Sequence, residues 1–459
     1  MPISLQPDEP DHKHKVQRPG HWLPEDHRVH QRWLEAMVKK VETHPKPFHP
    51  VIKEFQQLIE NDTRLFILAS QMWDEVPARE PYNKDPDGKC IIRGYEHMLQ
   101  LVNYLLDCAP DWSTDSEKIG LIGKPIFAVL DWAMGTATGF AFFLDPKVNQ
   151  MLKKVLDVWC DFLKSPESAS CLDDSESGWF GPTGYKELLS TGNLINKSNY
   201  NFHELYQCAP DEKRYGFKSW DHFFTREFNW ERRPVAEPEN QNVIVNSCES
   251  QPYRIQSNIS YRDKFWTKTM PYSLYDMLQG DESTEQFVGG TCYQAFLSAL
   301  SYHRWHSPVS GTVTKITSIP GTYYSEPRFE DFSDGRGSED AGATLSGTSL
   351  AQAYLAAVAT RCLIFIQADN PALGLICVVQ VGMSEVSSVD VTVKEGQHLE
   401  KGQEIGMFHF GGSTWCLLLR KGVNVRGLPH PEVVNDRNVP VRSKLCEIVS
   451  DDQVQSNGS

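Results

Sequence analysis

The sequence predicts an α+β protein, in which a helical N-terminal domain precedes a domain of mixed, mainly antiparallel β structure. Three observations support this division. Through the first part of the chain, apolar residues recur every three to four positions, which is the spacing of amphipathic helices. After about residue 240 they alternate or form short continuous runs, which is typical of strands. Between these regions, residues 164–178 are polar and acidic, and we expect them to form a linker.

The composition is that of a globular protein large enough for two or three domains, because the chain has 459 residues of which 40% are hydrophobic. Its net charge of -15 disfavours nucleic acid and an anionic membrane surface as partners. The 11 cysteines lack Cys-x-x-Cys pairs, which favours free thiols in a reducing compartment. The cytoplasm is therefore the expected location.

Residues 1–20 are expected to form a disordered tail, because they are rich in proline and charged residues. They lack both the apolar core of a secretory signal and the arginine-rich, acid-poor face of a mitochondrial presequence. Histidines recur in and after this tail, but no acidic or cysteine partner stands at ligand spacing, so we expect no metal site. These histidines are His12, His14, His21, His27 and His30.

Residues 21–163 are predicted to form the helical domain. In its first helix, at 26–42, apolar side chains recur at three-to-four residue steps from Val29 to Val41. No motif in this domain points to catalysis. Further helices are expected at 50–59, 64–72, 94–106, 124–143 and 148–162.

The apolar run at 126–144 has the length of a possible membrane span. It contains Asp131, whose charge is costly inside a bilayer, and two glycines at Gly135 and Gly139. We therefore expect a pair of buried helix segments and no stable membrane insertion.

Residues 179–459 are predicted to form the β domain, with one helix at 219–227. The insertion at 326–345 is interpreted as a mobile surface loop, with a lid over the active site as the alternative. Asp331 and Asp334 resemble part of a calcium loop, but the remaining ligands are out of place. Strands are expected at 243–245, 253–255, 311–316, 362–367, 375–381, 386–393 and 415–419.

Two glycine-containing hairpins, at 307–313 and 393–403, resemble strands of biotinyl and lipoyl carrier domains. Such carriers display a lysine at a hairpin tip, and no lysine stands at a matching tip here. The hairpins therefore predict a small β sandwich or barrel-like sheet whose turns pack near the Gly412–Ser413 bond. A non-catalytic binding module built on such a sandwich is an alternative.

The stretch Phe408–Thr414 can cleave itself on chemical grounds. Gly411 and Gly412 lack Cβ atoms, so their backbone can adopt dihedral angles closed to other residues and leave the Gly412 carbonyl uncovered. The Ser413 hydroxyl can reach that carbonyl. With a base and oxyanion donors, the acyl group can shift from nitrogen to oxygen, and elimination from the ester leads to a pyruvoyl group. A plain glycine turn before an exposed serine is the alternative.

Three ordered segments resemble the phosphatidylserine decarboxylase family, whose members self-cleave before the serine of a Leu-Gly-Ser-Thr or Gly-Gly-Ser-Thr motif. The segments are Trp220–Phe228 with Arg232–Pro234, then Tyr302–Gly311, then Phe408–Thr414. With the long region in front of them, they are most similar to the soluble fungal branch that contains the L-tryptophan decarboxylases. The resemblance implies a β domain of phosphatidylserine decarboxylase type. It also implies that the helical domain at 21–163 is the accessory domain that precedes the catalytic part in this branch.

The resemblance also implies a site. Cleavage between Gly412 and Ser413 would turn Ser413 into a pyruvoyl cofactor, and the two resulting chains would stay associated. His306 is expected to be the base that activates Ser413, and His303 to assist substrate binding or decarboxylation. Glu249 stands where the family has an orienting aspartate, and its side chain is one methylene longer. Without the family pattern, the two histidines also fit half a zinc site, and Glu249 a strand-end charge.

The implied function is decarboxylation of a primary amine that carries an α-carboxylate. We expect a free amino acid, because the chain shows no convincing anchor, membrane-docking helix or basic patch. The resemblance to the tryptophan branch implies an aromatic L-amino acid such as L-tryptophan, which gives tryptamine. A phosphatidylserine decarboxylase that makes phosphatidylethanolamine is the alternative. His409, Tyr323 and Tyr324 are candidates for the lining of the pocket.

Overall fold

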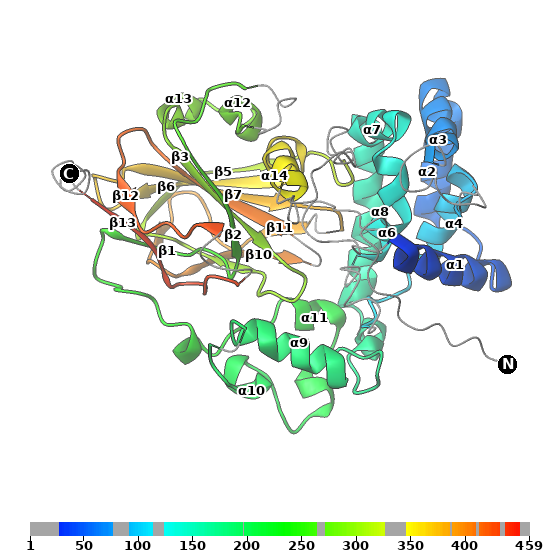
Figure 1. Cartoon of the computed structure of the whole chain (residues 1–459), viewed down its shortest axis with the longest axis horizontal. Helices are drawn as coiled ribbons and strands as arrows, with labels where there is room; N and C mark the ends of the chain where they lie inside the picture. The colour runs from blue at the N-terminus through cyan, green and yellow to red at the C-terminus, as the bar shows by residue number, and fades with distance from the viewer. Residues whose placement is uncertain are drawn as a thin grey trace, which may run out of the picture.

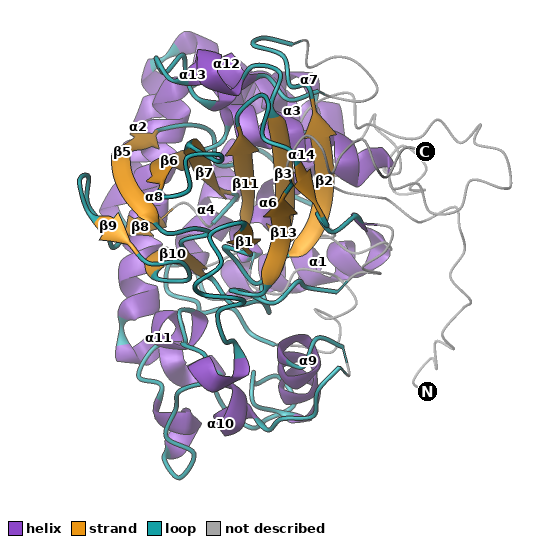
Figure 2. Cartoon of the chain, turned by 90° about the vertical axis from the view of Figure 1, so that its left-hand side faces the viewer, coloured by secondary structure: helices purple, strands orange, loops and turns teal. Residues whose placement is uncertain are grey.

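A computed structural model describes most of the chain. Its α-helices and antiparallel sheets confirm the predicted α+β class. Figure 1 shows the helical domain beside the sheets, and Figure 2 shows the strands in front with this domain behind them. The predictions for the tail at 1–20, the insertion at 326–345 and Gly412 lie outside the described residues. These residues are 27–76, 91–112, 124–195, 197–263, 271–325, 346–385, 388–409, 413–431 and 437–449.

Short polar side chains set the starts of several N-terminal helices. The Asp62 carboxylate accepts hydrogen bonds from the backbone N–H groups at the start of α3, and Asp145 does the same for α8. Thr136 caps α7 and so separates it from α6, which divides the apolar run at 126–144 into two helices, as predicted. Nearly all of α6 is buried, whereas α7 buries one face. The helices are α1 His27–Thr43, α2 Pro50–Asn61, α3 Thr63–Glu75, α4 Tyr95–Leu105, α6 Pro125–Met134, α7 Ala137–Leu144 and α8 Pro146–Lys164. Within the described ranges, none of the helices combines the length and the apolar character that crossing a membrane requires.

Short helices and turns connect the helical domain to the sheets. The expected linker at 164–178 contains η5, and its buried Ser168 hydroxyl accepts a hydrogen bond from the Trp220 backbone N–H at 2.9 Å. This bond ties the segment to α11, which is shorter than the predicted helix. The elements are η5 Pro166–Cys171, α9 Pro182–Gly192, α10 Phe202–Leu205, η6 Lys213–Gly216, α11 Trp220–Phe224 and η7 Trp230–Arg232.

Three antiparallel sheets form the β domain. The largest has the order β2-β3-β11-β7-β6-β5-β9, and two three-stranded sheets have the orders β4-β10-β8 and β1-β13-β12. The strands are β1 Val243–Val245, β2 Gln251–Ser257, β3 Thr291–Leu297, β4 Arg304–His306, β5 Gly311–Ile319, β6 Arg361–Ala368, β7 Leu375–Gly382, β8 Ser388–Val391, β9 His398–Leu399, β10 Glu404–His409, β11 Ser413–Leu419, β12 Val425–Arg426 and β13 Lys444–Ile448. The remaining helices are α12 Leu274–Met277, α13 Thr284–Phe287 and α14 Ser346–Val358.

The strand β11 is buried along its whole length because both faces of its sheet are covered. Trp415 and Leu417 belong to the core between the sheets, together with Trp305. Cys416 and Leu418 point the other way and belong to the core shared with the helices. Residue Ser413, the first of β11, therefore lies on the same face as Trp415, toward the smaller sheets.

Candidate active site

Ser413 begins the strand β11 between β3 and β7. Its Cα partners are Leu297 on β3 and Gly382 on β7. The side chain is fully buried, and its hydroxyl has no hydrogen-bond partner among the residues that the structure describes. Buried hydroxyls in proteins are nearly always hydrogen-bonded, so an unpartnered one marks a place where chemistry or a ligand is expected. A free serine hydroxyl at this point fits the precursor of a pyruvoyl group.

The segment 246–250 lies on the face of the sheet to which Ser413 points. The Trp415 indole N–H donates to the Ser250 hydroxyl at 2.9 Å, and the Cys248 sulfur lies 3.9 Å from the Gln380 side chain. Glu249 stands between these two residues, but its carboxylate makes its hydrogen bonds elsewhere. The segment predicted to hold the orienting acid is therefore close to β11, but the carboxylate itself faces elsewhere.

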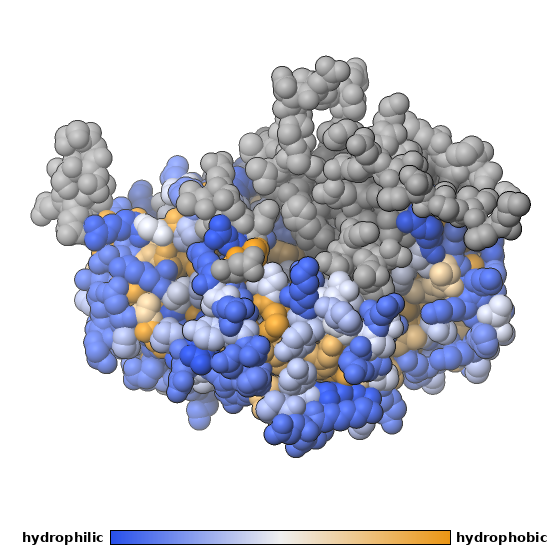
Figure 3. Space-filling model, turned by 60° about the horizontal axis from the view of Figure 1, so that its bottom comes forward, coloured by the Kyte–Doolittle hydropathy of each residue, from blue (hydrophilic) through white to orange (hydrophobic). Residues whose placement is uncertain are grey.

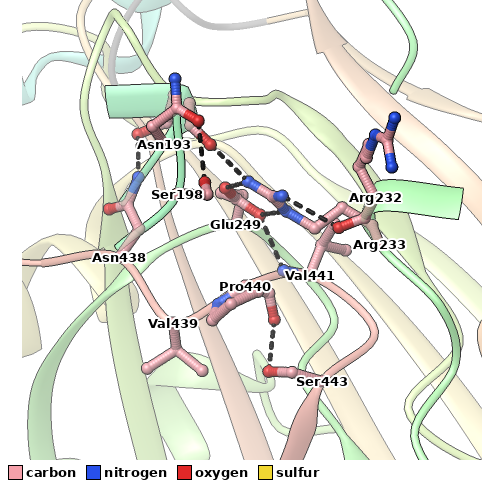
Figure 4. A network of polar contacts seen from close by, with 12 residues as sticks. Asn193, Ser198, Arg232, Arg233, Glu249, Asn438, Val439, Pro440, Val441 and Ser443 are labelled. Carbon is pink, nitrogen blue, oxygen red and sulfur yellow. Dashed lines mark hydrogen bonds and ion pairs between the residues drawn. The ribbon is translucent and has the colours of Figure 1, made fainter. Parts of the chain in front are cut away.

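Glu249 is held by an arginine, as Figure 4 shows. The Arg233 Nε and Nη2 groups donate to its two oxygens at 2.8 and 2.5 Å, and the Val441 backbone N–H donates at 2.9 Å. Both side chains of this ion pair are buried. Burial lowers the pKa of Arg233, but the Glu249 carboxylate outweighs it and keeps that pKa raised. Glu249 thus contacts Arg233 from the Arg232–Pro234 segment, rather than His306.

His306 is fixed as a neutral imidazole. Its Nδ1 lies 2.9 Å from the Gly402 carbonyl oxygen, which can only accept, so Nδ1 carries the proton. Its Nε2 then accepts from the Tyr302 hydroxyl at 3.2 Å. Burial lowers the pKa of His306 to about 3, so the ring stays uncharged at neutral pH. Within the described ranges, no hydrogen bond joins this imidazole to Glu249 or Ser413.

His303 lies where the chain turns toward Ser413. It is fully buried, and its ring stacks on Phe224 of α11 with ring centroids 4.0 Å apart. Its carbonyl oxygen accepts from the Phe408 backbone N–H at 2.9 Å, near the end of β10. The structure therefore brings His303 next to the strand that precedes Ser413, while His306 lies three residues further along toward Gly402.

His409 links two carboxylates next to this strand end. Its Nδ1 is 2.8 Å from the Asp221 carboxylate, and its Nε2 is 3.4 Å from that of Asp390. Burial lowers the pKa of His409, but the hydrogen bond and charge of Asp221 raise it more. The sequence predicted only a pocket-lining residue here, because it could not show that Asp221 on α11 meets the end of β10.

The sequence analysis gave no role in the site to Tyr302 or Arg233. Both lie inside segments that carried the family resemblance, so their position was the available signal. What the sequence could not show is that a hydroxyl four residues before His306 folds back onto its ring, or that Arg233 takes the Glu249 carboxylate.

Comparisons with known proteins show the family to which the chain belongs. Two sequence profiles, both described as phosphatidylserine decarboxylase, match residues 49–188 and 220–442. The decarboxylase iboD of Amanita muscaria is 43% identical over 298 residues, covering 64% of this chain and 83% of the relative. An L-tryptophan decarboxylase of Psilocybe cyanescens is 32% identical over 413 residues, covering 87% and 88%. The phosphatidylserine decarboxylase proenzyme 3 of Schizosaccharomyces pombe is 29% identical over 222 residues, covering 48% and 21%.

Proposed function

Because the chain belongs to the phosphatidylserine decarboxylase family and is a carboxy-lyase, we propose that it decarboxylates a free, aromatic L-amino acid with a pyruvoyl cofactor made from Ser413. L-tryptophan, giving tryptamine, is the proposed type of substrate. The observation that carries the proposal is the buried Ser413 hydroxyl directly after two glycines, which has no hydrogen-bond partner among the described residues. Similarity to an L-tryptophan decarboxylase over most of both chains supports the substrate class.

In this proposal His306 is the base for the self-cleavage between Gly412 and Ser413. Its Nε2 atom accepts a hydrogen bond from the Tyr302 hydroxyl. This hydroxyl therefore either relays the Ser413 proton to the imidazole or lies beside its path. The Gly402 carbonyl orients the ring, as an acid does in other serine–histidine pairs. The pyruvoyl group, once formed, supplies an electron sink for loss of carbon dioxide.

Glu249 is proposed to act through its neighbours. Its carboxylate fixes Arg233, and its negative charge reaches Tyr302. Burial is the main cause of the raised pKa of Tyr302, and the charges of Glu404, Glu227 and Glu249 add to it, so this hydroxyl stays protonated beside His306. His303, stacked on Phe224, is proposed to assist substrate binding or decarboxylation.

The two chains made by cleavage are proposed to stay associated. The strand β11 would begin the small chain, and it pairs with β3 and β7 along its full length. Its side chains are buried in both cores, so separating it would expose apolar residues such as Trp415 and Leu417 to water. We place the enzyme in the cytoplasm, because the cysteines in the described ranges are free thiols.

A phosphatidylserine substrate is the second candidate, because relatives named phosphatidylserine decarboxylase proenzyme match 48% and 46% of this chain. The net charge of -15 disfavours binding to anionic lipid surfaces. On the face shown in Figure 3, apolar residues are interspersed with hydrophilic ones. These features favour the free amino acid.

Intact-mass measurement tests the proposal. We expect wild-type protein to run as two pieces, and S413A to remain a single chain of 52.2 kDa without decarboxylase activity. S257A, which alters an exposed serine on β2, is the matched control and is expected to split like wild type. Purified wild-type protein is then assayed on L-tryptophan and on phosphatidylserine vesicles. An S413A protein that still decarboxylates would refute the cofactor assignment.

A further inference from the structure

The helical domain contacts the sheet at the end that carries Ser413. Figure 1 shows α6, α7 and α8 as the helices of this domain that lie nearest the sheets. We propose that Glu385 is a positioning residue: by binding the start of α6 it fixes the end of β7 beside Ser413, so that self-cleavage requires the docked helical domain. This inference rests on the proposed function.

The end of β7 is the nearest backbone to Ser413 on one side. Gly382, the last residue of β7, is the register partner of Ser413. Its N–H donates to the Thr360 carbonyl at 2.9 Å, and two residues on, the Ser384 N–H donates to the Tyr323 carbonyl at 3.0 Å. Ser384 has a positive φ of 56°, a conformation that side-chain-bearing residues rarely hold without support from their surroundings. The position of Gly382 therefore depends on how the residues that follow it are held.

Two bonds from the helical domain hold these residues. The Phe127 N–H in the first turn of α6 donates to the Glu385 carboxylate at 2.7 Å. The Tyr323 N–H donates to the Asn149 side-chain oxygen on α8 at 3.1 Å, and the Asn149 amide group donates to two carbonyls of its own domain. Because Tyr323 and Ser384 are bonded to each other, both bonds act on the same strand end. The helical domain thus supports the backbone beside Ser413 from two helices.

The charges around Glu385 make this contact specific. Lys124 is the residue before α6, and it is buried beside the positive end of the helix dipole, which disfavours its ammonium. The Glu385 carboxylate offsets that charge and supplies α6 with a cap. Burial raises the pKa of Glu385 and lowers that of Lys124, and each group partly reverses the shift of the other. Burial raises the pKa of the Tyr324 hydroxyl, and the charge of Glu385 adds to this shift.

Small displacements at this strand end are expected to matter, because attack of a hydroxyl on the neighbouring carbonyl needs near-ideal alignment. A shift of about 1 Å in reacting groups can cost on the order of 100-fold in rate. Loss of the Glu385 contact releases the residues after Gly382, so we expect slow self-cleavage in a protein that is otherwise folded.

Pulse-chase of newly made full-length protein, followed by intact mass, tests the proposal. E385L, which lacks an acceptor for the Phe127 N–H, is expected to slow splitting at least 10-fold. E385D keeps the charge, but its shorter side chain moves the carboxylate away from the Phe127 N–H, so its self-cleavage is expected to be slow as well. E385Q, whose amide oxygen can accept the same bond, is expected to stay within about 3-fold of wild type. E54Q, at an exposed ion pair of α2, is the control and is expected to split normally.

Thermal unfolding of the same variants, made also with S413A so that none can split, separates positioning from folding. A folded E385L or E385D that splits at the wild-type rate overturns the proposal. If E385L fails to fold, E385D decides. If E385Q is as slow as E385L, the bond to Phe127 is not what positions the strand, which also overturns it. Failure of the wild-type protein to split would instead count against the proposed function.

Discussion

Two buried glutamates flank β11, and they are held in different ways. Glu249 accepts hydrogen bonds from two N–H groups of Arg233 and from the backbone N–H of Val441, both of which lie outside the helical domain. Glu385 receives one N–H from α6, and its Oε2 atom has no hydrogen-bond partner within the described part of the chain. The carboxylate of Glu249 is fully hydrogen-bonded, as a rigid structural element requires. Glu385 joins two domains and keeps one carboxylate oxygen without a hydrogen bond from the described residues. From this difference we expect the Glu249–Arg233 side of Ser413 to act as a rigid frame, and the Glu385 side to depend on docking of the helical domain.

Removal of Arg233 is expected to have the largest effect on stability. R233M leaves the Glu249 carboxylate buried and unpaired, and we expect a loss of about 3–5 kcal/mol in the free energy of unfolding. R233M/E249L, which removes both charges, is expected to recover most of it. Urea unfolding in the S413A background, where the chain stays whole, measures both. A single variant that loses less than about 1 kcal/mol would show that the frame is not rigid.

Removing the Tyr302 hydroxyl tests the same side of Ser413 more finely. Y302F takes away the donor to the His306 Nε2 atom, and we expect self-cleavage to slow by about 10-fold, with the fold unchanged. Y293F is the matched control, because Tyr293 is also buried and its hydroxyl has no partner among the described residues. Pulse-chase rates decide, and equal rates in Y302F and wild type would remove Tyr302 from the proposed machinery.

Removing Lys124 should cost less than removing Arg233. An ammonium can release its proton when it is buried, and the pKa of Lys124 is lowered by burial, whereas a guanidinium stays charged. For K124M in the S413A background we therefore expect a loss of about 1 kcal/mol in the free energy of unfolding. A loss as large as that of R233M would show that Lys124 and Arg233 stabilise their glutamates equally, which contradicts the difference described above.

Much of the fold could be predicted from the sequence, because burial leaves a local pattern. Asp131 in the apolar run at 126–144 argued against a membrane span and for two helix segments, and the structure has α6 and α7 there. The strand β7 was predicted from a continuous apolar stretch. The strand β3 was missed because its centre holds Gln294, a polar residue that is buried in the core. Its amide is satisfied by Tyr272 and Thr414, which are distant in sequence. No local pattern reports such a partner.

The candidate site was predicted only in part, for a similar reason. Motif segments identified Ser413, His303, His306 and Glu249, but roles within the site depend on which way each side chain points. Glu249 lies in a bent segment over β11, and its carboxylate meets Arg233, which no local sequence pattern reports. The contact between Phe127 and Glu385 joins residues that are 258 positions apart and carry no shared motif. Their roles stay predictions that the variants above can test.

The smallest expected effect concerns His409, at the boundary between the two sides of Ser413. Burial lowers its pKa, yet the bond and charge of Asp221 raise it above its ordinary value. The folded protein thus holds this proton more tightly than the unfolded chain, so the stabilisation is complete below pH 6.5 and is lost as pH rises through the folded pKa. We expect wild-type protein to lose up to about 1 kcal/mol between pH 6 and pH 8 relative to H409Q, because the pair is partly accessible to water. D221N should lose the same slope; if it keeps the wild-type slope in urea unfolding across this range, the Asp221–His409 pair is not its source.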